Sequence, residues 1–392
     1  MSTTNGLDNP SEPPSTEGGS RRTRRVIAIA GASLGVVLVA AVALVVIGGT
    51  SDNDQPASTS THQSMVTGTI WVANEAGGSL TAIDAATNTV ATTVSGVDGP
   101  HNVQASPDGT SVWAVSGDGY AAMLATDSLE LHGTVLTGEA PAHVVVSPDG
   151  ATVYTTNGGD DTVSVIDAST MRPLGVIKVG QGPHGLRPSP DGRWLYVANI
   201  GGTTLSVIDT RTDKRVGDVE VGQAPAQVAF SPDGRFIYAS LNGEDAVAKV
   251  DTRSRKLVSK VPVGDGPIQT YVGGDNRYLL VANQGTEKQP GTTVSVIDTS
   301  TFTVAATVET GKGPHGIVID PSSRHAYVTN IYSDDVAILD LSELKVIARV
   351  PVGDKPNGVS FSALTLEHRG NVTLQLPESV GGSRDEMDMS GH

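Results

Sequence analysis

A stretch of about 42 residues recurs seven times along the chain, and this repeat constrains the fold more than any other feature of the sequence. A proline marks each copy, and the gaps between successive prolines are 41, 42, 42, 42, 47 and 42 residues. An aromatic residue or Leu and an Asp recur with the same period and in the same number. The three sets are Pro100, Pro141, Pro183, Pro225, Pro267, Pro314 and Pro356; Trp71, Trp113, Tyr154, Tyr196, Tyr238, Leu280 and Tyr327; and Asp84, Asp127, Asp167, Asp209, Asp251, Asp298 and Asp340.

Each copy divides into four short apolar runs separated by turn residues. In one copy, residues 144–146 precede the turn sequence Ser-Pro-Asp-Gly at 147–150, and further runs follow at 153–156, 163–166 and 176–179. Proline sets φ early in such a turn, and glycine accepts a positive φ. Seven copies of a four-stranded unit predict an all-β, seven-bladed β-propeller, which leaves only short and protected sheet edges.

The order of the segments predicts how the ring closes. The first copy begins at its second strand (69–73), and the last copy ends after its first strand (358–361). We therefore expect a composite closing blade, with the innermost strand from residues 356–363 and the outer three from residues 68–97. The propeller domain then covers 67–363, and 364–392 form a C-terminal tail. An eighth blade would need a repeat in this tail, where 371–376 is the one candidate strand.

An uncharged run of 22 residues, 26–47, follows four arginines at 21–25. At about 1.5 Å per residue such a helix spans a bilayer core of roughly 30 Å, and arginines favour the cytoplasmic side. We predict a disordered basic cytoplasmic segment (1–25), a transmembrane signal anchor (26–47) and a flexible linker (48–66), which place the propeller outside the cytoplasm on a single-pass anchor. A signal cleaved after Sec or twin-arginine export, giving a secreted protein, is the alternative.

Composition narrows the function classes. The formal net charge of −16 argues against nucleic acid as a partner, because phosphate binding needs clustered Lys and Arg. The chain has no Cys, which removes disulfides, thiolate metal sites and cysteine nucleophiles. The sequence signatures of zinc proteases, P-loop proteins and haem attachment are missing as well.

Several motifs resemble a known family. They are Tyr196-Val197-Ala198-Asn199, Tyr327-Val328-Thr329-Asn330, Val165-Ile166-Asp167 and Val207-Ile208-Asp209. With the four Ser-Pro-Asp-Gly turns they are similar to the YVTN β-propeller repeat, in its YncE-like and surface-layer branch, over about 68–363. The resemblance implies the propeller fold and an exported binding or surface protein. Related propellers bind haem in dissimilatory nitrite reductase and copper in nitrous-oxide reductase, so the resemblance supports the fold better than the function.

Histidines gather where the innermost strands begin. His101, His184, His315 and Asn357 directly follow repeat prolines, and His143 lies one position later in its copy. The propeller topology predicts that these side chains surround one mouth of the central channel. A ring of imidazoles there would bind a metal ion, a haem or an anionic group. The structural alternative is that each His hydrogen-bonds a neighbouring loop carbonyl.

Three further features bear on binding. Arg187 is expected to face the channel, where it either holds an anionic ligand or pairs with an acidic neighbour. Acidic loop residues on the histidine face, such as Glu75, predict either a rim that attracts cations or merely solvated loops. In the tail, Met387, Met389 and His392 combine thioether and imidazole donors that suit copper, and a disordered acidic tail is the alternative.

The sequence thus predicts a membrane-anchored, extracytoplasmic propeller that acts as a non-enzymatic scaffold for a ligand or a protein. The alternative function is a metal- or haem-binding propeller, oxidoreductase-like or copper-handling, that uses the channel-mouth histidines.

Overall fold

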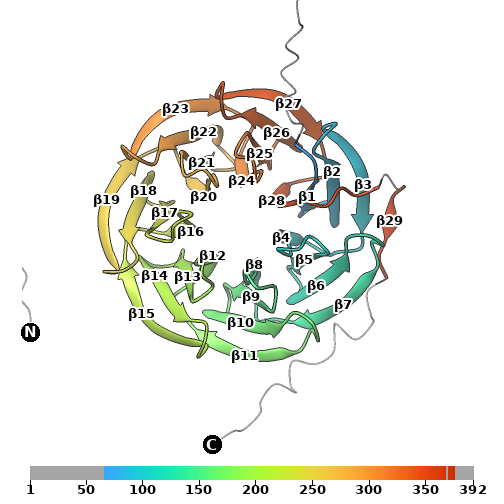
Figure 1. Cartoon of the computed structure of the whole chain (residues 1–392), viewed down its shortest axis with the longest axis horizontal. Coiled ribbons are helices and arrows are strands. Elements are labelled where there is room, and N and C mark those ends of the chain that lie inside the picture. The colour runs from blue at the N-terminus through green and yellow to red at the C-terminus, as the bar shows by residue number, and fades with distance from the viewer. Residues whose placement is uncertain (1–65, 368–369, 376–392) are drawn as a thin grey trace, which may run out of the picture. The chain divides into compact units, whose positions relative to one another are not determined.

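The computed structural model describes residues 66–367 and 370–375, which form seven β-sheets around a central channel (Figure 1). Every regular element in this part of the chain is a strand, which confirms the prediction of an all-β, seven-bladed propeller. No helix within the described ranges is long and apolar enough to cross a bilayer. The anchor predicted at 26–47 and the tail residues Met387, Met389 and His392 lie outside the described residues.

Blades 2 to 7 are four-stranded, and each runs outward from the channel in sequence order. Blade 2 contains β4 (Pro100–Ala105), β5 (Ser111–Ser116), β6 (Tyr120–Ala125) and β7 (Leu131–Leu136). Blade 3 contains β8 (Pro141–Val146), β9 (Thr152–Asn157), β10 (Thr162–Asp167) and β11 (Pro173–Lys178). Blade 4 contains β12 (Pro183–Pro188), β13 (Trp194–Asn199), β14 (Thr204–Asp209) and β15 (Lys214–Glu220).

The remaining regular blades repeat this arrangement with small differences in strand length. Blade 5 contains β16 (Pro225–Phe230), β17 (Phe236–Leu241), β18 (Ala246–Asp251) and β19 (Lys256–Pro262). Blade 6 contains β20 (Pro267–Val272), β21 (Tyr278–Gly285), β22 (Pro290–Asp298) and β23 (Thr303–Glu309). Blade 7 contains β24 (Pro314–Ile319), β25 (His325–Asn330), β26 (Asp335–Asp340) and β27 (Lys345–Pro351).

Blade 1 closes the ring by combining segments from both ends of the propeller. Its strands are β28 (Pro356–Ser362), β1 (Thr69–Asn74), β2 (Ser79–Asp84), β3 (Thr89–Ser95) and β29 (Val372–Thr373), in that order. β28 pairs antiparallel with β1, with Ser360 opposite Trp71, as the order of the segments predicts. β29 pairs parallel with β3 at the outside of the ring, so the candidate strand of the tail extends blade 1 and starts no eighth blade (Figure 1).

The seven recurring aromatic or Leu positions form the core between blades. Trp71, Trp113, Tyr196, Tyr238 and Tyr327 are each 1% exposed, and Tyr154 and Leu280 are equally enclosed. The core around Tyr327 also contains Ile70 and Val72 of the neighbouring blade 1, so each landmark side chain packs one blade against the next. The outermost strands are mostly exposed, as Leu174 and Val176 on β11 illustrate.

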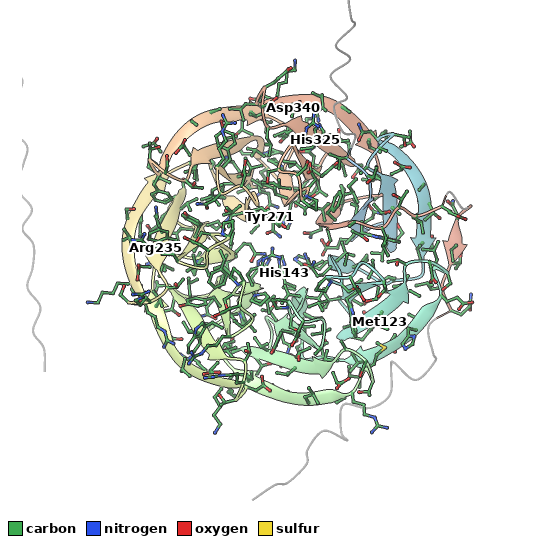
Figure 2. The ribbon with its side chains drawn as sticks, viewed as in Figure 1. Met123, His143, Arg235, Tyr271, His325 and Asp340 are labelled. Atoms are coloured by element: carbon green, nitrogen blue, oxygen red, sulfur yellow. The ribbon has the colours of Figure 1, made fainter. Side chains whose placement is uncertain are left out.

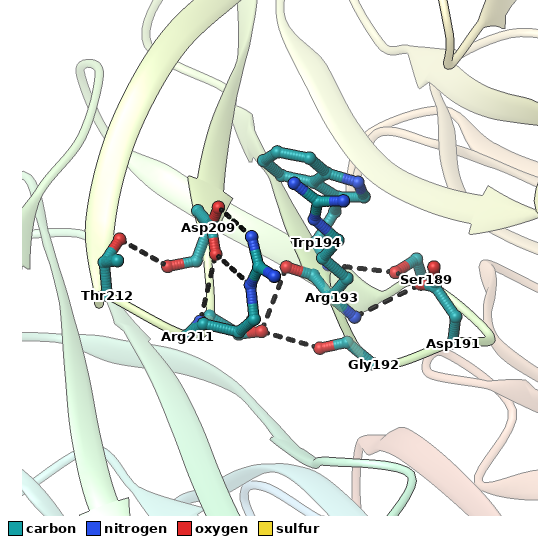
Figure 3. A network of polar contacts seen from close by, with 9 residues as sticks. Ser189, Asp191, Gly192, Arg193, Trp194, Asp209, Arg211 and Thr212 are labelled. Carbon is teal, nitrogen blue, oxygen red and sulfur yellow. Dashed lines mark hydrogen bonds and ion pairs between the residues drawn. The ribbon is translucent and has the colours of Figure 1, made fainter.

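The Ser-Pro-Asp-Gly turns form a regular network at the face opposite the histidines. In blade 3, Ser147 Oγ donates to Asp149 Oδ1 at 2.5 Å, the N–H of Ala151 donates to the same oxygen at 3.1 Å, and Gly150 has φ +75°. Figure 3 shows the equivalent turn of blade 4, with Ser189 bonded to Asp191 and the repeat Asp209 accepting from Arg211. The repeated Asp therefore caps the turn that follows its strand, as Asp167 also does by accepting the N–H groups of Ser169 and Thr170.

A histidine cluster at the channel mouth

A break in strand register places the polar side chains at the channel mouth. In blade 4, Pro183 pairs with Asn199 and Leu186 with Val197, and the register shifts between these pairs. Such a bulge bends a strand and re-aims its side chains. The shift leaves little room beside it, because a Cβ at Gly185 would clash with the side-chain oxygen of Gln227. This contact explains why His184 is followed by glycine.

The ring brings four histidines from four blades together, as the sequence predicts for their position. The ring centroids of His143 and His184 are 4.7 Å apart, and His101 lies 5.9 Å from His143 and 5.6 Å from His184. His315 lies 6.1 Å from His101. One ring nitrogen from each of His101, His143 and His184 lies within 4.8 Å of the other two. Figure 2 shows His143 beside the central channel.

Hydrogen bonds fix the orientation of these rings. His184 Nδ1 donates to the carbonyl of Ala226 at 2.9 Å, which leaves Nε2 of the neutral ring with a free lone pair. This bond is the one predicted by the structural alternative, but it uses only one of the two ring nitrogens. His143 Nδ1 lies 3.4 Å from Gln227 Nε2.

Several buried polar atoms of the mouth have no hydrogen-bond partner among the described residues. They are His101 Nε2, His143 Nε2, His315 Nδ1, Gln269 Oε1 and Asn357 Oδ1. A buried polar atom without a partner loses its hydration with nothing in return. Two of these atoms belong to His101 and His143, whose ring nitrogens lie close together, and such unpartnered atoms are typical of a site that is completed by a bound group.

The acidic residue Glu75 links the cluster to the closing blade. Asn357 Nδ2 donates to Glu75 Oε2 at 2.8 Å, and Glu75 Oε1 lies 3.4 Å from His101 Nδ1. The hydrogen bond with His101 lowers the pKa of Glu75 to about 2 against the opposing effect of burial. Sequence reasoning placed Glu75 on this face only as part of an acidic rim. Its contact with His101 depends on how neighbouring blades meet.

Burial holds three of the four imidazoles, those of His143, His184 and His315, in their neutral form. Burial, followed by the charge of His101, lowers the pKa of His184 to about 4 and that of His315 to about 3. Burial and then the neighbouring histidines hold the pKa of His143 well below its usual value. A neutral imidazole is the form that ligates metals.

The channel below the histidines contains a cavity of about 250 Å³. Arg187 lines it and extends its guanidinium over the ring of Tyr271, 5.5 Å from the ring centroid. Within the described residues, no carboxylate forms an ion pair with Arg187, so the acidic partner that was the sequence alternative is not found. Arg187 thus lines the cavity, whereas Asn357 contacts Glu75 and His101.

The chain matches a protein family over more than half its length. The family described as "YNCE-like beta-propeller" matches residues 135–242 and 217–370. Among curated proteins, none matches the sequence.

Solved structures share the fold. Hydrazine synthase of Kuenenia stuttgartiensis is 26% identical over 68% of this chain and 90% of that chain, with a TM-score of 0.62. Dihydro-heme d1 dehydrogenase NirN in complex with DHE is 16% identical over 75% of both chains, with a TM-score of 0.58. A putative 6-phosphogluconolactonase from Bacteroides uniformis is 20% identical over 76% of this chain and 99% of that chain, with a TM-score of 0.64. These proteins differ in function, so the likeness shows the fold alone.

Proposed function

The chain belongs to the YNCE-like β-propellers, and on this basis we propose that it is a binding protein that holds a first-row transition-metal ion at its channel-mouth histidines and catalyses no reaction. The family is the one predicted from the repeat motifs. The observation that carries the proposal is the set of three imidazoles, from three blades, whose ring nitrogens lie within 4.8 Å of one another.

The donor set suits Zn²⁺, Cu²⁺ or Ni²⁺. Imidazole is a preferred ligand of these ions, and a site of three histidines leaves a further position open. Metal–nitrogen bonds of about 2.0–2.1 Å place two ligand atoms of a tetrahedral site about 3.4 Å apart. The three ring nitrogens therefore have to move inward by about 1 Å to enclose an ion.

Glu75 supports the proposal as a residue that positions His101. Metal-bound histidines commonly donate their second N–H to a carboxylate, which fixes the tautomer and makes the ligand more basic. In the tautomer that carries its proton on Nδ1, His101 donates to Glu75 and leaves the lone pair of Nε2 for the ion.

We also propose that residues 26–47 hold this propeller at the outer side of the membrane. The uncharged run and the arginines before it support this placement. Protease treatment of intact cells tests it: degradation of the propeller supports the placement, and protection until the cells are lysed contradicts it.

Calorimetric titration of the full chain with Zn²⁺ tests the metal site. We expect one ion per chain, with binding abolished when His101, His143 and His184 are all replaced by Ala. His132→Ala, a change at an exposed histidine of β7, is the matched control and should bind like the wild type. Unchanged binding in the triple variant, or no binding in the wild type, would contradict the proposal.

A visible spectrum and an elemental analysis of the purified protein separate this function from its rivals. Haem on the histidines remains a prediction from related propellers, and an intense Soret absorption would favour haem over a bare ion. Turnover of a defined substrate that disappears in the triple variant would refute a purely binding role. Copper retained by the triple variant and lost on deletion of 385–392 would assign copper to Met387, Met389 and His392.

A further inference from the structure

The channel cavity below the histidines has its own chemistry. Its volume of about 250 Å³ is enough for several water molecules or one small ligand. Its lining changes from His143 and Gln269 near the mouth to Gln104, Arg187 and Tyr271 further in, and to Asp320 at the opposite end. Arg187 is the one Lys or Arg among these lining residues, so the middle of the cavity is positively charged.

The nearest acidic lining residue does not neutralise Arg187. Asp320 is 1% exposed, and its carboxylate accepts the backbone N–H groups of Ser322 at 2.7 Å and His325 at 2.6 Å. It also lies 3.6 Å from His325 Nδ1. The carboxylate therefore serves the turn of blade 7, and among the described residues it forms no ion pair with Arg187.

Neighbouring residues keep the guanidinium in the cavity. Ala229, the residue at the same position in blade 5, has a small side chain between the blades of Arg187 and Tyr271. The guanidinium lies over the face of Tyr271, which orients its plane and leaves its N–H edge free of any hydrogen bond to the described residues. Figure 2 shows Tyr271 at the centre of the ring.

A cation held in a narrow channel without a counter-ion is costly, because desolvation is not offset by pairing. The planar guanidinium presents parallel N–H groups that match two oxygens of one anion better than a spherical ion. We propose that the channel binds a small oxyanion, either a carboxylate or an inorganic oxyanion, on Arg187. His143 lines this cavity as well as the metal site, but Arg187, which would hold the anion, is not a proposed metal ligand, and anion binding does not depend on the metal.

Titration of the chelator-treated full chain with acetate, nitrate, sulfate and chloride tests the proposal by calorimetry. We expect saturable binding of one oxyanion per chain, with at least about tenfold weaker binding of chloride. Acetate and nitrate or sulfate distinguish a carboxylate from an inorganic ligand. No saturable binding of any oxyanion, or chloride binding as tightly, would overturn the proposal.

Two variants locate the binding. Arg187→Gln should weaken oxyanion binding by at least about tenfold, and Arg187→Lys, which keeps the charge but loses the planar fork, should fall between it and the wild type. Arg235→Gln removes a cation that also stacks on an aromatic ring, Phe236, but lies outside the channel lining, and it should bind normally. Equal loss in Arg235→Gln would contradict the site.

If Arg187→Gln is less stable than the wild type, the shift in melting temperature caused by the oxyanion still reports binding. The oxyanion should raise the melting temperature of the wild type and of Arg235→Gln, and leave that of Arg187→Gln unchanged. An equal rise in Arg187→Gln would show that the anion binds elsewhere.

Discussion

The two faces of the propeller are built from the same repeat but treat polar groups in opposite ways. At the turn face, the Ser and Asp of each Ser-Pro-Asp-Gly sequence bond to each other and to the backbone. At the mouth face, buried atoms of His101, His143, His315, Gln269 and Asn357 have no partner among the described residues. The polar groups of the turns are paired within the chain, whereas those of the mouth face leave atoms unpaired, which is why we propose a ligand there.

The two faces also differ in sequence: the turn sequence repeats, whereas the position after each repeat proline varies. The turn sequence occurs four times without change, because each residue has a local task in its own turn. The position after the repeat proline holds His, Ala, Ile or Asn, since its side chain meets side chains of other blades. A position that varies within a regular scaffold is where a binding site can be formed without loss of the fold.

The largest expected effect is on Zn²⁺ affinity, which should depend on the mouth end of blades 3 and 4 and not on their turn end. Replacing His143 and His184 together by Ala should weaken Zn²⁺ binding by at least about 100-fold, because two of three ligands are lost. Replacing Ser147 and Ser189, at the opposite ends of the same blades, should leave binding unchanged. Calorimetry on both double variants checks this comparison, which fails if the two pairs behave alike.

Acid should destabilise the two faces in different pH ranges. The mouth histidines resist protonation when folded but take up protons when unfolded below about pH 6.5, so stability falls as pH drops from there towards about 4. We expect a loss of at least about 2 kcal/mol by about pH 4.5.

The carboxylates of the turns become protonated at a lower pH than the histidines of the unfolded chain. The hydroxyl of Ser147 lowers the pKa of Asp149, and that of Ser189 lowers the pKa of Asp191, so their contribution persists down to the unfolded value of about 3.9 and is lost below it. Urea unfolding measures the free energy of unfolding at each pH. Between about pH 4 and about pH 6.5, this free energy should depend less on pH in His143→Ala/His184→Ala than in the wild type, and in no other variant. The same weaker dependence on pH in Ser147→Ala/Ser189→Ala would be inconsistent with this division.

A medium effect is expected from the residue behind His101. Glu75→Gln keeps the shape of the side chain and removes its charge, so metal affinity should fall by about tenfold. Glu244→Gln is the control, because this acidic residue occupies the corresponding loop of blade 5 and pairs with Lys260 away from the histidines. Equal losses in both variants would indicate a general effect of surface charge.

The smallest effect concerns one turn. Ser147→Ala removes the hydroxyl that bonds Asp149 and the N–H of Thr152, and should cost about 1 kcal/mol in the free energy of unfolding. Metal binding should not change. Denaturant unfolding measures the loss. Weaker metal binding in this variant would contradict the claim that the turn face does not contribute to the metal site.

The fold was predictable from sequence because its causes are local and repeated. Pro148, Asp149 and Gly150 determine a turn within four residues, and the period alone implies closure by the two ends. β29 was not assigned to blade 1, because a two-residue parallel pairing with β3 leaves no pattern in the sequence.

The site was predictable in position but not in detail. The residues after the prolines had to reach the channel mouth, and His101, His143, His184 and His315 do meet there. The bond from Asn357 to Glu75 joins residues 282 positions apart, and it exists only because the ring closes between them. The depressed pKa values likewise follow from burial that several blades produce together.

X-ray absorption at the zinc edge of the Zn²⁺-loaded full chain tests the central claim most directly. We expect three imidazole nitrogens at about 2.0 Å, and no sulfur in the first coordination shell. A shell of oxygen atoms alone, or of methionine sulfur with one nitrogen, would place the metal elsewhere and contradict the assignment of the mouth histidines as its ligands.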